Sequence, residues 1–135
     1  MVKTIKYEIE TGRDTLHNIT DNINKTILDS KIVNGVVTVE TTDAGAGILL
    51  VNCQSEMIKE DVINEMRKIV PARINYKYQE SPEAAAGNIK SSLFSKSVNV
   101  IVEEGKLICE DKQEICLAEY DGPNRRTYTV CVIGE

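Results

Sequence analysis

The stretch that decides the fold is Glu119-Tyr120-Asp121-Gly122-Pro123-Asn124-Arg125-Arg126. Apolar runs that are typical of strands flank it on both sides, at residues 114–118 and 127–133. Asp-Gly-Pro stops a strand and turns the chain, because glycine accepts positive φ while proline fixes φ and donates no backbone hydrogen bond. The stretch therefore predicts a turn between two β-strands.

Chemically active side chains gather at this predicted turn. Strand side chains alternate between two faces, so Gln113, Glu119 and Asp121 should share one face with the apolar residues between them. The guanidiniums of Arg125 and Arg126 follow just beyond the turn. Two carboxylates and two guanidiniums could form a ligand pocket or a structural ion-pair cluster, and the residues leave both interpretations open.

Hydrophobic periodicity predicts the other elements. The predicted strands lie at residues 3–10, 36–41, 48–52, 98–102, 106–109, 114–118 and 127–133. The predicted helices lie at about 18–31, 56–70 and 82–94. The third helix has a clear start, because Ser81 is a good N-cap and Pro82 suits the first helical position.

Strands and helices follow one another in blocks rather than in strict alternation. This order predicts an α+β fold with a largely antiparallel or mixed β-sheet packed against about three helices. A chain of 135 residues without repeats or linkers is expected to form a single compact domain over residues 1–135.

Composition excludes several classes of partner. The formal net charge of −5 argues against a nucleic-acid surface, which needs clustered Lys and Arg. No apolar run reaches membrane-spanning length, and the N-terminus lacks the apolar segment of a signal peptide. We therefore expect a cytoplasmic protein with neither a nucleic-acid nor a membrane partner. The four cysteines contain no C-x-x-C pair and are expected to be buried thiols.

Two further segments carry polar side chains that suit a site. Glu40, Thr41 and Thr42 end a buried strand and lead into a glycine-containing break at residues 43–47, where a ligand could approach the backbone. The other segment is on the third helix and contains Asn88, Lys90, Ser91 and Ser92. Asn88 and Ser92 share a helix face because they are four residues apart.

Together these segments resemble the YjbQ family, whose members are described as secondary thiamine-phosphate synthases. The resemblance extends from about Leu16 to Glu135. Its motifs are Ile19-Thr20, Asn34-Gly35, Thr41-Thr42, Asn88-Ile89-Lys90-Ser91-Ser92-Leu93, Gln113 and Glu119-Tyr120-Asp121-Gly122-Pro123. The resemblance implies a compact α+β domain, a homotrimer, and a site where the polar segments converge.

The sequence departs from the family pattern at three histidines. Glu40, Tyr78 and Asn88 stand at the corresponding positions. Neutral Tyr and Asn are poor zinc ligands and do not titrate near neutral pH, so we expect neither a metal nor another cofactor. A hard cation such as magnesium could use only the carboxylates of Glu40, Glu119 and Asp121.

Three functions stay open at this stage. The favoured one is a divergent homotrimer that has lost or altered its ancestral chemistry and binds a small anionic, for example phosphorylated, metabolite through Arg125 or Arg126. The second is a thiamine-phosphate-synthase-type enzyme that uses Glu40 with Glu119 or Asp121 as general acid and base. The third is a structural or interaction trimer without a ligand. The expected ligand-binding residues are Thr41, Thr42, Asn88, Ser92, Gln113, Gly122, Arg125 and Arg126.

Overall fold

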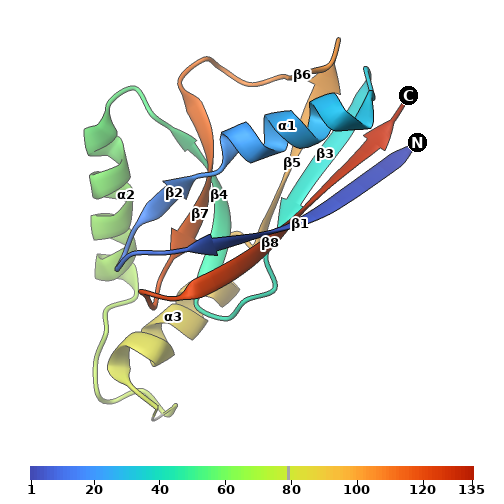
Figure 1. Cartoon of the computed structure of the whole chain (residues 1–135). Coiled ribbons are helices and arrows are strands. Elements are labelled where there is room, and N and C mark those ends of the chain that lie inside the picture. The colour runs from blue at the N-terminus through green and yellow to red at the C-terminus, as the bar shows by residue number, and fades with distance from the viewer. Residues whose placement is uncertain (79) are drawn as a thin grey trace.

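The computed structural model describes residues 1–78 and 80–135, which form two antiparallel β-sheets and three α-helices (Figure 1). The larger sheet has the strand order β1 (Val2–Glu10), β8 (Arg125–Gly134), β3 (Gly35–Glu40), β5 (Ser97–Glu103) and β6 (Lys106–Leu107). The smaller sheet has the order β2 (Leu16–Asn18), β7 (Gln113–Glu119) and β4 (Ala46–Asn52). The α+β prediction is therefore confirmed.

The helices are α1 (Thr20–Ser30), α2 (Glu56–Ile69) and α3 (Pro82–Leu93). Side-chain caps begin two of them, because the Ser55 hydroxyl accepts a hydrogen bond from the backbone of Met57 and the Ser81 hydroxyl accepts one from that of Ala84. The predicted start of the third helix is confirmed. None of the helices in the described residues is both long and apolar enough to cross a membrane.

One strand was not predicted from the sequence. β2 is only three residues long, which is too short for hydrophobic alternation to be recognised. It exists because its backbone pairs with β7, from Leu16 opposite Ala118 to Asn18 opposite Cys116. This pairing extends the smaller sheet and places the preceding loop, residues 11–15, beside the predicted turn, where the backbone N–H of Thr11 donates to the carbonyl oxygen of Asn124.

The hydrophobic core lies between the inner faces of the two sheets. Alternate residues of β8 point inward, so that Tyr128, Val130 and Val132 are buried. Ile115 and Leu117 of β7 face them, and α1 closes the core with buried isoleucines. Each such side chain contributes about 1.5–3 kcal/mol when it is fully buried. The next inward positions at the site end of these strands belong to Arg126 and Glu119.

Candidate functional site

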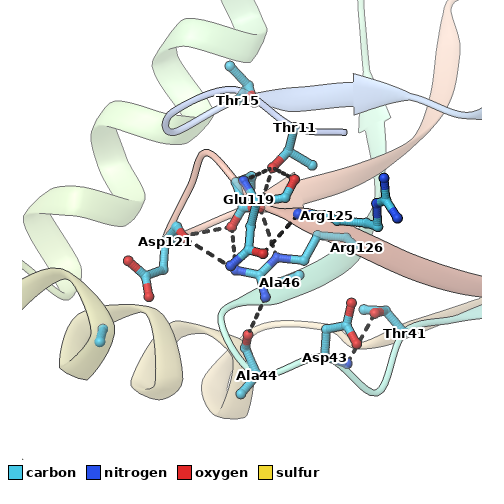
Figure 2. A network of polar contacts seen from close by, with 12 residues as sticks. Thr11, Thr15, Thr41, Asp43, Ala44, Ala46, Glu119, Asp121, Arg125 and Arg126 are labelled. Carbon is cyan, nitrogen blue, oxygen red and sulfur yellow. Dashed lines mark hydrogen bonds and ion pairs between the residues drawn. The ribbon is translucent and has the colours of Figure 1, made fainter. Parts of the chain in front are cut away.

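A buried ion pair closes the core between the two sheets. Arg126 Nε donates to Glu119 Oε1 at 2.8 Å, and Nη2 donates to Oε2 at 2.8 Å (Figure 2). The side-chain exposures are 8% for Arg126 and 0% for Glu119. This is a bidentate pair, the geometry in which a guanidinium and a carboxylate interact best.

Neighbouring groups complete the hydrogen bonding of both partners. The Thr11 hydroxyl donates to Glu119 Oε1, and the backbone N–H of Asp121 donates to Oε2 at 2.9 Å. Arg126 Nη1 donates to the carbonyl oxygen of Ala44 at 2.9 Å (Figure 2). Burial alone would raise the pKa of the Glu119 carboxyl, but its hydrogen bonds, above all those from Arg126, hold that pKa below its ordinary value.

A second set of contacts fixes the loop between β3 and β4 to the start of β8. The Thr41 hydroxyl donates to the carbonyl oxygen of Thr127 at 2.8 Å. The Asp43 carboxylate accepts the backbone N–H of Thr127 at 2.8 Å, and Lys96 Nζ donates to the Asp43 carbonyl oxygen at 2.8 Å. Thr41 is buried and holds the backbone in place, whereas Thr42 is exposed.

The three predicted segments meet in space. A Cβ atom added to Gly87 of α3 would lie 3.1 Å from Asp121 Cβ and 3.5 Å from Gly45 Cα. Glycine at position 87 therefore lets the helix touch both the loop after β3 and the turn after β7. The backbone segments converge as expected, although not all of their side chains do.

Several of the predicted side chains point elsewhere. Glu40 is exposed at the end of β3. Arg125 is exposed beside Glu10, to which its Nε donates at 2.8 Å. Arg126 donates a hydrogen bond from each of its three nitrogens within the ion-pair network. This geometry gives Arg126 a structural role, and ligand binding by either arginine stays a prediction.

Asn88, Ser92 and Gln113 do not line the space beside the ion pair. Asn88 and Ser92 line a separate, mostly apolar groove of about 460 Å³ with Tyr78. Asn88 Nδ2 donates to its own helix, at the Ala84 carbonyl oxygen. Gln113 begins β7, the strand that Glu119 ends, and its side chain donates to Asn52. Roles for these residues in a common site stay predictions.

A cleft lies on the other side of the predicted turn. One hollow of about 410 Å³ is lined by Asp121, Gly122 and other polar residues. A second hollow of about 170 Å³ shares Asp14, Glu83 and Tyr120 with the first, so the two adjoin. Figure 2 shows the Asp121 carboxylate pointing away from the Arg126 guanidinium. Of the predicted catalytic residues, Asp121 is the one that borders the hollow of about 410 Å³, which is large enough for a small metabolite.

Lys90 lies at the base of this cleft and is the residue that sequence reasoning underrated. Its exposure is 6%, and within residues 1–78 and 80–135 its Nζ makes no hydrogen bond or ion pair. Nζ lies 5.8 Å from the centre of the Tyr120 ring, a weak cation–π contact. A lysine at a buried helix position is the one signal in the sequence, because lysine is almost never fully buried without a partner.

The electrostatics of the cleft are mixed. Burial lowers the pKa of Lys90, the Asp14 carboxylate opposes this shift, and the Arg67 guanidinium adds to it. Arg67 Nη2 itself donates to Asp14 Oδ2 at 2.8 Å. Burial also raises the pKa of Asp121, with Arg126 acting against it and nearby carboxylates adding to it. The cleft therefore holds a largely buried amine and a carboxyl whose pKa is raised by burial.

Comparisons with known proteins agree with the sequence motifs. A family model described as "UPF0047 protein YjbQ-like" matches residues 4–135. A UPF0047 protein of Methanocaldococcus jannaschii is 34% identical over 131 residues, which are 96% of this chain and 94% of that protein. UPF0047 protein YugU of Bacillus subtilis is 28% identical over 134 residues, 99% of this chain and 100% of that protein.

Solved structures share the whole fold. A YbjQ-like protein of unknown function from Sulfolobus solfataricus superposes with a TM-score of 0.92 at 26% identity, covering 100% of this chain and 99% of that one. An uncharacterised conserved protein of the YjbQ/UPF0047 family from Clostridium acetobutylicum gives a TM-score of 0.88 at 29% identity, covering 96% and 99%.

Proposed function

We propose that this chain, which belongs to the YjbQ-like UPF0047 family, binds a small anionic metabolite in the cleft around Lys90. Family membership does not by itself name a reaction, since the Sulfolobus relative is described as a protein of unknown function. The proposal therefore depends on the chemistry of the cleft.

The observation that carries the proposal is the unpaired Lys90. An ammonium that is largely withdrawn from water and has no acceptor in the described chain costs free energy, because much of its hydration is lost and no protein atom replaces it. A phosphate or carboxylate in the adjoining hollow of about 170 Å³ would supply the missing acceptors. Arg67 and Arg13 stand around the same cleft and would add to the attraction for an anion.

The carboxylates in the cleft narrow the class of ligand. Asp14, Glu83 and Asp121 line the two hollows and accept hydrogen bonds when ionised. A simple inorganic anion would leave these acceptors unused. A metabolite that carries a phosphate or carboxylate at one end and hydroxyl or amino donors at the other fits this charge pattern better.

Thermal denaturation tests the proposal directly. A ligand that binds only the native state at 100 times its Kd adds about 2.7 kcal/mol of stability, so inorganic phosphate or ribose 5-phosphate should raise Tm by several degrees. Lys90→Gln should remove this increase. The matched control is Lys68→Gln, because Lys68 is an exposed lysine of α2 paired with Glu65. Equal stabilisation of the wild type and Lys90→Gln would contradict the proposal.

A second candidate function rests on Asp121. A carboxyl with a raised pKa beside an open hollow suits a general acid or base, as a thiamine-phosphate-synthase-type reaction would need. The chain should then restore growth to a strain that lacks thiamine-phosphate synthase, and Asp121→Asn should abolish the growth. Absence of growth with the soluble, folded wild-type protein would contradict this candidate.

A homotrimer is also part of the proposal. The outer face of the larger sheet carries a row of exposed apolar side chains on four adjacent strands. The row, in register, is Val2, Ile133, Val36 and Ile101. Apolar patches of this kind mark interaction surfaces. The next row is neutral and small, with Thr4, Cys131, Thr38 and Asn99. We assign these two uncharged rows to contacts with other copies of the chain, since an uncharged patch suits association with itself. The row that follows on the same face is charged, with Lys6 and Glu40.

A further inference from the structure

We propose that Lys90 forms an imine with an aldehyde or keto group of the bound anion. This inference rests on the proposed function, because it assigns the ligand class of the same cleft. It goes further in one respect: it makes the amine of Lys90 a nucleophile rather than only a positive charge.

The surroundings of Nζ favour a nucleophilic amine. Its inner neighbours are mostly apolar: Leu16, Ile63 and Met66 line a narrow space of about 10 Å³ that Lys90 also borders, together with Asp14, Glu119 and Tyr120. The outer hollow of about 170 Å³ gives a small carbonyl compound room to reach Nζ. With no hydrogen bond to hold them within the described chain, the amine hydrogens and the lone pair are free to reorient toward a ligand.

Burial supports the same conclusion. Desolvation favours the neutral form of an amine, and it is the main cause that lowers the pKa of Lys90. The nearby charges act in opposite directions, since the Asp14 carboxylate raises that pKa and the Arg67 guanidinium, which is paired with Asp14, lowers it by less. The proton that the ammonium releases can pass to solvent through the outer hollow.

The step needs no co-reactant. The Nζ lone pair forms a bond to the carbonyl carbon, and the carbon–oxygen π pair moves to the oxygen, which takes up a proton. The resulting carbinolamine loses the hydroxyl as water while Nζ gives up its remaining proton, leaving a carbon–nitrogen double bond. One amine and one carbonyl thus become one imine and one water, with no change of oxidation state.

Reductive trapping tests the inference. The full-length protein is incubated with glyoxylate, which carries an aldehyde and a carboxylate, and sodium borohydride is then added to reduce any imine to a stable carboxymethyl amine. Intact-mass and peptide mass spectrometry locate the adduct. We expect Lys90 to be modified at least tenfold more than Lys68, and we expect acetaldehyde, which lacks the anion, to label Lys90 less than glyoxylate does. Preferential labelling of exposed lysines would overturn the proposal.

A variant separates imine formation from anion binding. Lys90→Arg keeps the positive charge but cannot form an imine, so it should lose the adduct while phosphate still raises its Tm. If phosphate stabilises the wild type but glyoxylate labels Lys90 no better than Lys68, the imine is wrong and anion binding stands. If phosphate gives no stabilisation and Lys90 is not labelled, both proposals fail. Labelling of the wild type needs no variant, so poor folding of Lys90→Arg would not prevent the test.

Discussion

At the scale of single residues, Glu119 and Lys90 represent opposite solutions for a buried charge. Glu119 is fully paired, with Arg126, Thr11 and a backbone N–H all donating to its two oxygens. The Nζ atom of Lys90 has neither an ion pair nor a hydrogen bond in the described chain, and the residue is 6% exposed. An unpaired buried charge lowers the stability of the folded state, whereas breaking a buried ion pair lowers it further. Substitution of Lys90 and of Glu119 should therefore change the free energy of unfolding in opposite directions.

Glu119→Gln should strongly destabilise the fold. The substitution leaves the buried Arg126 guanidinium without its counter-charge, at a cost of about 3–5 kcal/mol. Urea unfolding measures the loss, and Arg125→Gln is the control, because an exposed pair with Glu10 contributes little. In the double variant Glu119→Gln with Arg126→Met, the loss should be smaller than the sum of the two single losses. Additive losses would contradict a coupled pair.

The Glu119 carboxyl should also make stability depend on pH. Its folded pKa is lowered, so its contribution is present above the unfolded value of about 4.3 and disappears as pH falls through the folded pKa. The free energy of unfolding should therefore fall below about pH 4.3, and this part of the fall should be missing in Glu119→Gln. An identical pH profile for both proteins would show that other carboxyls are responsible.

Lys90→Met should stabilise the protein. It removes an unpaired buried ammonium and leaves an apolar side chain of similar length, which should raise the free energy of unfolding at pH 7 by about 1 kcal/mol. Because the folded pKa of Lys90 is lowered, the difference from the wild type should shrink as pH rises toward the unfolded value. Denaturant unfolding at two pH values measures both effects. A structural lysine would give the reverse result, a loss of stability.

At the scale of elements, the three helices are attached to the sheets with different strength. Three residues of α1 are buried and six of α3 are, whereas none of the described residues of α2 is. α2 is held mainly through half-buried side chains such as Ile63 and through ion pairs such as Lys59 with Glu114. It nevertheless forms one wall of the Lys90 cleft, through Arg67 and Met66.

Hydrogen exchange should therefore be faster in α2 than in α1. Local opening is easiest where little apolar surface is buried, so the backbone amides of α2 should exchange with lower protection in mass-spectrometric measurements. Inorganic phosphate should slow the exchange of α2 if the cleft binds it, because the ligand bridges α2 and α3. Equal protection of both helices without ligand would contradict this view of the packing.

At the scale of the whole molecule, the uncovered face of the larger sheet predicts association. Ile101→Lys places a charge at the β5 end of the apolar row, so it should reduce the mass measured by light scattering from that of three chains to the 15.0 kDa of one. Leu28→Lys is the control, since Leu28 is 78% exposed on α1, away from that face. A wild-type protein with the mass of one chain would contradict the homotrimer.

Local sequence signals determined the elements of this protein. Alternation and helical spacing predicted all three helices and the long strands, because these patterns depend only on which residues the backbone period places on one side. The Ser81-Pro82 start and the Asp-Gly-Pro turn were equally local. The short strand β2 escaped because its three residues become a strand only through pairing with β7.

Tertiary structure alone decided how the polar residues are used. The sequence placed Glu119 and Arg126 near one turn, but only the packing of two sheets made them a buried pair that is saturated with hydrogen bonds. It also left the Lys90 amine without a hydrogen-bond partner in the described chain, because side chains from α2, β2 and β7 enclose the space beside it. Burial and pairing depend on residues that are distant along the chain, and no local pattern contains that information.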